Sequence, residues 1–306
     1  MLSSETRRGI NIGISMAVLA TLIWSGNFII ARGVIKDIQP VSLAFYRWLT
    51  ATVIILPFAW KYFFPELKVF KNNFLYFLVT AVTGVSMFNT FVYIAGHYST
   101  AINMALLGTC TSPVISVILA RFFLKERITR LRITGMTVCI AGILLLLSKG
   151  SIENLVNFSF TKGDWWVLAA ALSFAIYNIM VKKKPVTMNP TNFLFIIFLI
   201  GTIILLPVYL YELKNKGGFA FNIPNLSSIL YLGLGASVIC FLIWNKAIAR
   251  LGAGRTALFG NLIPVFSSIE AVLFLNEKIS VIHLVSFTLV VAGLMIANLQ
   301  KKKIII

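Results

Sequence analysis

Residues 101–128 read AINMALLGTCTSPVISVILARFFLKERI, and residues 253–279 read AGRTALFGNLIPVFSSIEAVLFLNEKI. The second stretch repeats the pattern of the first, with small residues and a glycine before a proline and a glutamate near its end. Three matching pairs lie 151 residues apart: Pro113 and Pro264, Glu126 and Glu277, and, further on, Gly142 and Gly293. A period of half the chain is too long for a solenoid, whose repeats run to about 20–50 residues. The pattern therefore predicts one duplicated unit.

The repeat extends toward the beginning of each half. Asn27 lies 151 residues before Asn178, and Pro40 lies 150 residues before Pro190. We therefore expect two domains, residues 1–150 and residues 151–306, each holding one copy of the unit.

The composition is typical of a protein embedded in a bilayer. Hydrophobic residues make up 59% of the chain and charged residues 12%, whereas soluble domains carry about 25% charged residues. In a soluble protein the net charge of +18 would suggest a nucleic-acid partner. Here the basic residues lie in short connections between apolar runs, so we expect them to orient the chain in the membrane and expect no nucleic-acid partner.

Apolar runs long enough to cross a hydrocarbon core of about 30 Å predict five spans in each half. Their ranges are 11–32, 41–60, 74–95, 100–124, 131–148, 163–181, 190–210, 226–248, 254–275 and 280–299. An odd number of spans per copy makes the second copy enter the membrane from the opposite side. The predicted fold is an all-α integral membrane protein of ten transmembrane helices, arranged as two inverted five-helix repeats.

Basic residues predict the orientation. Nineteen of the 27 lysines and arginines fall on the side that holds both termini and the loops after spans 2, 4, 6 and 8, and seven fall on the other side. Since cytoplasmic loops carry the excess of basic residues, we expect both termini in the cytoplasm. The first apolar run, residues 10–31, is longer than the core of a signal peptide, so we expect it to remain in the mature protein. Inverted repeats are typical of secondary transporters, which bind substrate near the midplane between the two copies.

The chain resembles the EamA family of the drug/metabolite transporter (DMT) superfamily. The motifs are WSGNF at 24–28, FYR at 45–47, LKERI at 124–128, LNEKI at 275–279 and the small-residue stretches that reach proline at 113 and 264. The resemblance implies a fold of two EamA repeats and the export or exchange of small metabolites, commonly amino acids and in some members aromatic ones, across a bacterial inner membrane. Other branches carry nucleotide-like compounds.

Two charged residues lie well inside the predicted spans, where charge is expensive and normally faces a bundle interior or a wet cavity. Arg47 is either a structural residue near a membrane rim, or a gate, or the partner of a substrate carboxylate. Glu270 is either part of an internal hydrogen-bonded pair or a carboxylate that contacts the substrate or a coupling proton. Glu126 and Glu277, beside Arg127 and Lys278, are expected to form ion pairs that fix helix ends.

Polar and aromatic residues at helical spacing predict a central pathway between the repeats. Each residue alone could equally serve as a contact between helices, since amides and hydroxyls stabilise such contacts. The candidate substrate-binding residues are Trp24, Asn27, Asn89, Tyr93, Asn103, Tyr177, Asn178, Trp244 and Asn261. Nine residues separate Asn261 from Glu270, which places them on opposite sides of a straight helix unless Pro264 kinks it.

Other classes of function fit less well. An intramembrane enzyme would need clustered ligands or a nucleophile with its base, but the two histidines, His97 and His283, lie near span ends and no HExxH motif occurs. We expect no enzymatic activity, metal or cofactor. A flippase for lipid-linked substrates, a nucleotide-like metabolite carrier and a drug exporter remain alternatives on the same fold. One chain would supply both repeats, so a monomer suffices and a dimer stays open.

Overall fold

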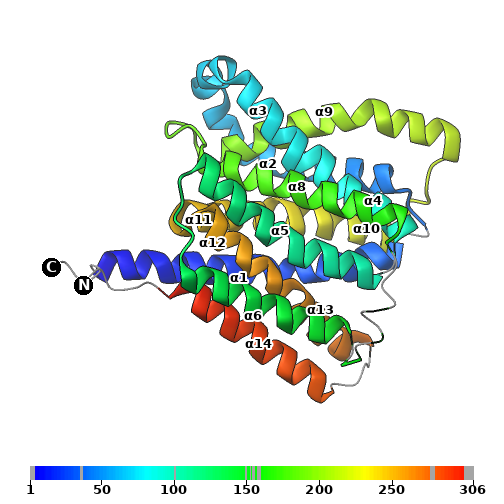
Figure 1. The fold of residues 1–306 in the computed structure, drawn as a ribbon. Helices are drawn as coiled ribbons and strands as arrows, with labels where there is room; N and C mark the ends of the chain where they lie inside the picture. The colour runs from blue at the N-terminus through cyan, green and yellow to red at the C-terminus, as the bar shows by residue number, and fades with distance from the viewer. Residues whose placement is uncertain are drawn as a thin grey trace.

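The computed structural model describes residues 4–34, 37–99, 101–148, 150, 151, 153, 156, 160–275 and 280–299. The regular secondary structure in these residues is helical, and Figure 1 shows the helices packed into one bundle. In chain order they are α1 (Ser4–Val34), α2 (Pro40–Asn72), α3 (Phe74–Ala81), η1 (Val82–Met87), α4 (Phe88–Tyr98), α5 (Ala101–Phe123), α6 (Arg130–Leu147), α8 (Lys162–Lys182), α9 (Pro190–Lys216), α10 (Ile223–Leu230), η2 (Tyr231–Ile239), α11 (Cys240–Leu251), α12 (Ala253–Leu258), η3 (Phe259–Asn261), α13 (Leu262–Leu275) and α14 (Val281–Asn298).

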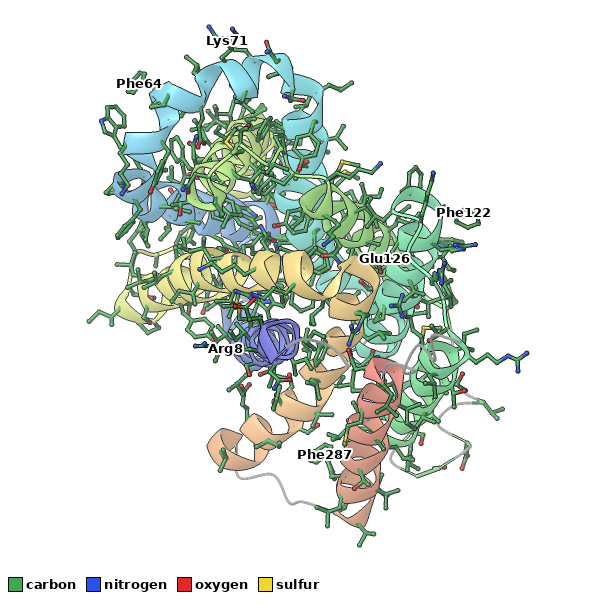
Figure 2. All side chains as sticks on the ribbon, turned by 90° about the vertical axis from the view of Figure 1, so that its left-hand side faces the viewer. Arg8, Phe64, Lys71, Phe122, Glu126 and Phe287 are labelled. Carbon is green, nitrogen blue, oxygen red and sulfur yellow. The ribbon has the colours of Figure 1, made fainter. Side chains whose placement is uncertain are left out.

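The helices and the surface are those of a multi-pass membrane protein. Eight helical stretches among the described residues are long and apolar enough to cross a bilayer. The two remaining predicted spans coincide with α5 and with the run from α12 to α13. Large apolar side chains project outward, as Phe64 and Phe122 do in Figure 2 with 59% and 75% of their surface exposed. The predicted all-helical membrane fold is confirmed, and ten crossings remain a prediction.

Two helices run further than the sequence predicts. Apolarity alone ends the second span at residue 60, whereas α2 continues to Asn72, and α9 continues to Lys216 instead of 210. The added turns contain both polar and apolar residues, so a search for apolar runs misses them. The helical backbone hydrogen bonds of α2 and α9 nevertheless continue through these turns. Figure 2 shows the far end of α2, labelled at Phe64 and Lys71, protruding beyond the neighbouring helices.

Helices α2 and α9 form an antiparallel pair whose ends are held by carboxylates. Each begins with proline, which lacks the N–H that a first turn leaves unpaired. Glu212 of α9 accepts hydrogen bonds from the Ser42 N–H (2.7 Å) and hydroxyl (2.9 Å). At the other end, Glu66 of α2 accepts from the Asn189 N–H (2.9 Å) and the Asn192 amide (2.7 Å). Negative charge at a helix N-terminus is favourable because of the unpaired N–H groups there.

Midway along this pair, two residues that occupy the same place in the sequence repeat meet each other. The Thr52 and Thr202 hydroxyls lie 3.3 Å apart, and the two residues are 150 positions apart in the chain.

Helices α6 and α14 cross in the same manner, side by side in Figure 1. The Cys139 thiol lies 3.4 Å from the Val290 carbonyl, 151 residues further on. On either side of that contact the backbones touch: a Cβ on Gly135 would lie 2.4 Å from the Gly293 carbonyl, and one on Gly142 would lie 3.0 Å from the Ser286 carbonyl. Small residues permit this close approach of two helices in a membrane.

Two wide helical stretches interrupt the predicted third and eighth spans. η1 and η2 are π-helical, and they occupy corresponding places in the two halves. A π-helix shifts the hydrogen-bond register by one residue and frequently marks a functional site. A third irregularity, η3, ends three residues before Pro264, which lacks an N–H and would clash with the Gly260 carbonyl in a regular helix.

The glycine contact between α6 and α14 predicts a sharp response to one added methyl group. Gly135→Ala should lower the free energy of unfolding by about 1–3 kcal/mol, because overpacking pushes the helices apart. Gly260→Ala is the control, since its Cβ would meet no other atom within 4 Å. Thermal unfolding of the detergent-purified variants measures the difference, and an unchanged midpoint for Gly135→Ala would show that the two backbones are not in contact.

Candidate substrate site

Arg47 lies in the interior of the bundle with only 1% of its surface exposed. Its Nε donates to the Ser237 hydroxyl (2.7 Å) and its Nη2 to the Ala236 carbonyl (3.0 Å), both in η2. Its Nη1 faces three acceptors, the side-chain oxygens of Asn27 (3.1 Å), Asn89 (2.9 Å) and Tyr93 (2.9 Å). We call Arg47 and these partners the arginine network. It joins α1, α2, α4 and η2 at one point inside the bundle.

Every partner in the arginine network is neutral. Arg47 forms no ion pair with any residue that the structure describes, although buried charges in proteins are usually paired. Arg47 Nη2 has two N–H groups, and Ala236 is its single acceptor among the described residues. The Asn89 side-chain nitrogen is buried and has no hydrogen-bond partner among them. The network therefore carries a positive charge and spare donors, which suits an anionic ligand.

A second polar group lies across the interior, on α5, α8 and α11. The Trp244 indole donates to the Asn178 side-chain oxygen (2.9 Å), and the Asn178 nitrogen reaches the Ser116 hydroxyl (3.5 Å). One residue before Asn178, the Tyr177 hydroxyl donates to the Asn245 side chain (2.8 Å). Tyr177, Asn178 and Trp244 are each at most 1% exposed.

The two polar groups are copies of one arrangement. Asn27 and Asn178 are 151 residues apart, and so are Tyr93 and Trp244. In the second half the amide and the ring bond directly to each other, whereas in the first half both bond to Arg47. The arginine thus makes the two halves of the site chemically different.

Aromatic rings connect the two groups. Trp24 lies with its ring centroid 4.9 Å from that of Trp244 and 5.7 Å from that of Phe174. Its indole N–H donates to the Ala236 carbonyl (2.8 Å), the same oxygen that Arg47 uses. The candidate site is consequently a guanidinium at one side, amides at both sides and aromatic surface between them.

Glu270 forms a separate contact with α1. Its Oε1 lies 2.6 Å from the hydroxyl of Ser25, the residue that follows Trp24 in the chain. Its Oε2 is buried with no partner in the described structure. The Asn261 side chain is likewise buried, with the Cys139 thiol as its neighbour, and neither Glu270 nor Asn261 hydrogen-bonds to the arginine network. The Asn103 side chain lies outside the described part of the chain.

Several residues in these contacts were not predicted from the sequence. Ser237, Ser116, Asn245 and Ser25 complete the two polar groups and the Glu270 contact. The repeat offered a signal for two of them, since Ser86 and Ser237, and likewise Ser116 and Ser267, are 151 residues apart. No feature of the sequence predicts the role of the Ala236 carbonyl, because its freedom to accept hydrogen bonds from side chains depends on the π-helical register of η2.

Comparison with known proteins gives consistent matches. Residues 11–148 and 161–299 match the model of the EamA-like transporter family. The chain is 28% identical over 291 residues to an uncharacterized transporter of Archaeoglobus fulgidus, covering 94% of this chain and 97% of that one. It is 25% identical over 294 residues to a probable amino-acid metabolite efflux pump of Salmonella typhimurium, covering 92% and 93%. A crystal structure with 16% identity matches with a TM-score of 0.77 over 95% of this chain and 96% of the other, and so has the same fold.

The arginine network should be essential to the fold as well as to binding. Arg47→Met keeps a long side chain but leaves the network acceptors without their donor, at about 1–3 kcal/mol for each buried orphan. We expect a loss of several kcal/mol, seen as a lower unfolding midpoint in detergent. Arg121→Met, on the exposed end of α5, should leave the midpoint unchanged. Equal midpoints for the two variants would contradict the described network.

Proposed function

The chain belongs to the EamA-like transporter family, and from that premise we propose that it exports or exchanges amino acids or closely related small metabolites by alternating access. The observation that carries the proposal is the buried Arg47, held by neutral groups and facing aromatic surface. A guanidinium binds a carboxylate through two parallel hydrogen bonds. Aromatic rings provide apolar surface for a substrate side chain. The efflux-pump name of the Salmonella relative favours the same substrate class.

The proposed architecture is two inverted five-helix repeats, residues 1–150 and 151–306. The contacts Thr52–Thr202 and Cys139–Val290 support it, because a residue meets its own repeat partner only on a two-fold axis. The paired end contacts of α2 and α9 favour the same relation. With both repeats in one chain, a monomer contains a complete site.

We propose a bacterial inner membrane location with both termini in the cytoplasm. The last turns of α5, α8 and α11 carry Arg121, Lys182 and Arg250 and lie at one end of the bundle, where Glu126 contacts Ala253 and Lys182 contacts Ala249. They adjoin the connections that the count of basic residues assigns to one side.

Transport requires the described conformation to open. Arg47, Tyr177, Asn178 and Trp244 are all closed off from solvent. In the alternating-access scheme they become accessible first from one side and then from the other, as one repeat rocks against the second.

Glu270 is the proposed proton-coupling group. The Ser25 hydroxyl lies within hydrogen-bond distance of both Glu270 and the Leu22 carbonyl, but it has one hydrogen to donate. When Ser25 donates its hydrogen to the Leu22 carbonyl, a protonated Glu270 can donate a hydrogen bond to the Ser25 oxygen. Loss of that proton would disturb α1 beside Trp24, which links protonation to the candidate site.

The deciding experiment is counterflow in proteoliposomes loaded with each amino acid in turn. We expect uptake of one chemical group of amino acids by the wild type, and loss of at least 90% of it in Arg47→Gln, whose folding is checked by size-exclusion chromatography. Arg47→Lys keeps the charge and should retain part of the activity. Failure of the wild type to move any amino acid would overturn the substrate class and turn attention to nucleotide-like, lipid-linked and drug-like compounds.

Proton coupling predicts a different behaviour for Glu270→Gln. The rate of uptake by the wild type should change with an imposed pH gradient. The rate of uptake by this variant should not change, since an amide side chain does not gain or lose a proton near neutral pH. Glu5→Gln, on the exposed start of α1, serves as the control. A variant that responds to the gradient as the wild type does would rule out Glu270 as the coupling group.

A further inference from the structure

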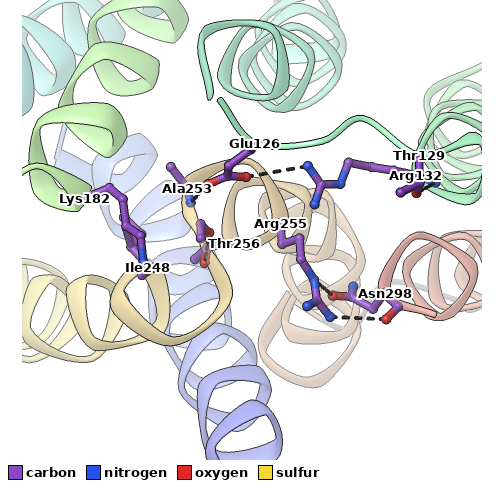
Figure 3. Close-up of polar contacts among 10 residues, drawn as sticks. Glu126, Thr129, Arg132, Lys182, Ile248, Ala253, Arg255, Thr256 and Asn298 are labelled. Carbon is purple, nitrogen blue, oxygen red and sulfur yellow. Dashed lines mark hydrogen bonds and ion pairs between the residues drawn. The ribbon is translucent and has the colours of Figure 1, made fainter. Parts of the chain in front are cut away.

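The loop that joins α5 to α6 reaches from the first half of the chain to the second. Figure 3 shows Glu126, within this loop, beside the start of α12. The Glu126 N–H bonds to the Ala120 carbonyl (3.1 Å), which fastens the loop to the end of α5. Figure 2 shows Phe122 directed away from the bundle and Glu126 lying toward its centre. The side chain is therefore aimed across the boundary between the halves.

The Glu126 carboxylate makes two contacts, one with each half of the chain. Its Oε1 accepts a hydrogen bond from the Ala253 N–H (2.9 Å), the first N–H of α12. Its Oε2 lies 3.5 Å from Arg132 at the start of α6, and not beside Arg127 as expected from the sequence. Both side chains are largely buried, at 17% and 10% exposed. Burial shields this ion pair from solvent, and a charged acceptor strengthens the bond to Ala253.

Glycines on both sides of Ala253 make the space for this carboxylate. A Cβ on Gly252 would lie 2.6 Å from Oε1, and one on Gly254 would lie 3.1 Å from Oε2. Gly252 also has a φ of +93°, which L side chains rarely adopt. The second half of the chain is thus shaped to receive a side chain of the first half.

Two further polar contacts beside it stay within the second half. Lys182 bonds to the Ala249 carbonyl (2.9 Å) at the end of α11, and Arg255 bonds to the Asn298 side chain (3.1 Å) at the end of α14. These contacts join α8 to α11 and α12 to α14 (Figure 3). Among the polar contacts drawn there, Glu126 to Ala253 is the one that joins the two halves of the chain.

We propose that Glu126 is a gating residue for transport: its carboxylate holds the end of the bundle that contains Ala253 closed, and this end opens only when the contact is released. The inference rests on the alternating access proposed above. At this closed end, the start of α12 packs against Val117 and Ala120 of α5. An atom of each residue lies 3.4 Å from the position of a Cβ on Gly254. Both residues are at most 2% exposed in this closed arrangement.

The test measures opening directly, without a substrate. Val117→Cys places a thiol beneath the contact, and its labelling by a membrane-impermeant maleimide from the cytoplasmic side is quantified by peptide mass spectrometry. Adding Glu126→Ala should raise the labelling rate about tenfold, and Glu126→Gln should raise it less because the amide still accepts from Ala253. Glu212→Gln is the matched control, a buried carboxylate that joins the halves at the start of α2, and it should leave the rate unchanged.

A crosslink tests the same gate in the opposite direction. The 3.4 Å between the Ala120 Cβ and a Cβ on Gly254 is close to the separation of about 3.5–4.5 Å in disulfides. Ala120→Cys with Gly254→Cys should lose transport when oxidised and regain it on reduction. Unchanged labelling in both Glu126 variants, an equal rise in Glu212→Gln, or full transport by the crosslinked protein would overturn the inference. If the labelling rates change as expected but the protein transports no amino acid, the gating role of Glu126 is supported and the proposed substrate class is wrong.

Discussion

A hydrocarbon environment supplies no hydrogen-bond partner, so each polar group in a membrane-embedded bundle must find one within the protein. The start of α2 meets this constraint with Glu212 from α9, and the start of α12 meets it with Glu126 from the first half. Arg47 meets it with groups from three other helical elements. Long-range polar contacts therefore hold several helix ends and the candidate site together, while close backbone packing joins α6 to α14.

The same constraint explains why the candidate site lies where it does. A buried guanidinium needs several acceptors converging on one point, and the interface between two repeats brings helices from both halves together. The π-helical η2 adds a carbonyl that serves Arg47 and Trp24 at once. The same atoms thus stabilise the fold and form the candidate site, because the charge of Arg47 is hydrogen-bonded but has no anionic partner among the described residues.

Sequence reasoning recovers this site in part. Helical spacing places Asn89 and Tyr93 on one face of a helix and the repeat points to Asn27, but neither identifies Arg47 as the residue on which the three side chains converge. Glu126 pairs with Arg132 instead of its neighbour in sequence, since the turn at the end of α5 directs its side chain inward. The π-helical stretches escape prediction altogether, because apolar periodicity does not reveal a backbone hydrogen bond displaced by one residue.

The crossing of α6 and α14 has a consequence for the origin of the chain. Gly135 meets Gly293, Gly142 meets Ser286 and Cys139 meets Val290, so each contact is matched by one with the roles of the helices exchanged. An interface of this kind is isologous, the type that two identical subunits form around a two-fold axis. A single five-helix ancestor could have made it with a second copy of itself inserted upside down. Gene duplication would then have preserved an existing dimer and allowed an arginine to appear in one copy alone.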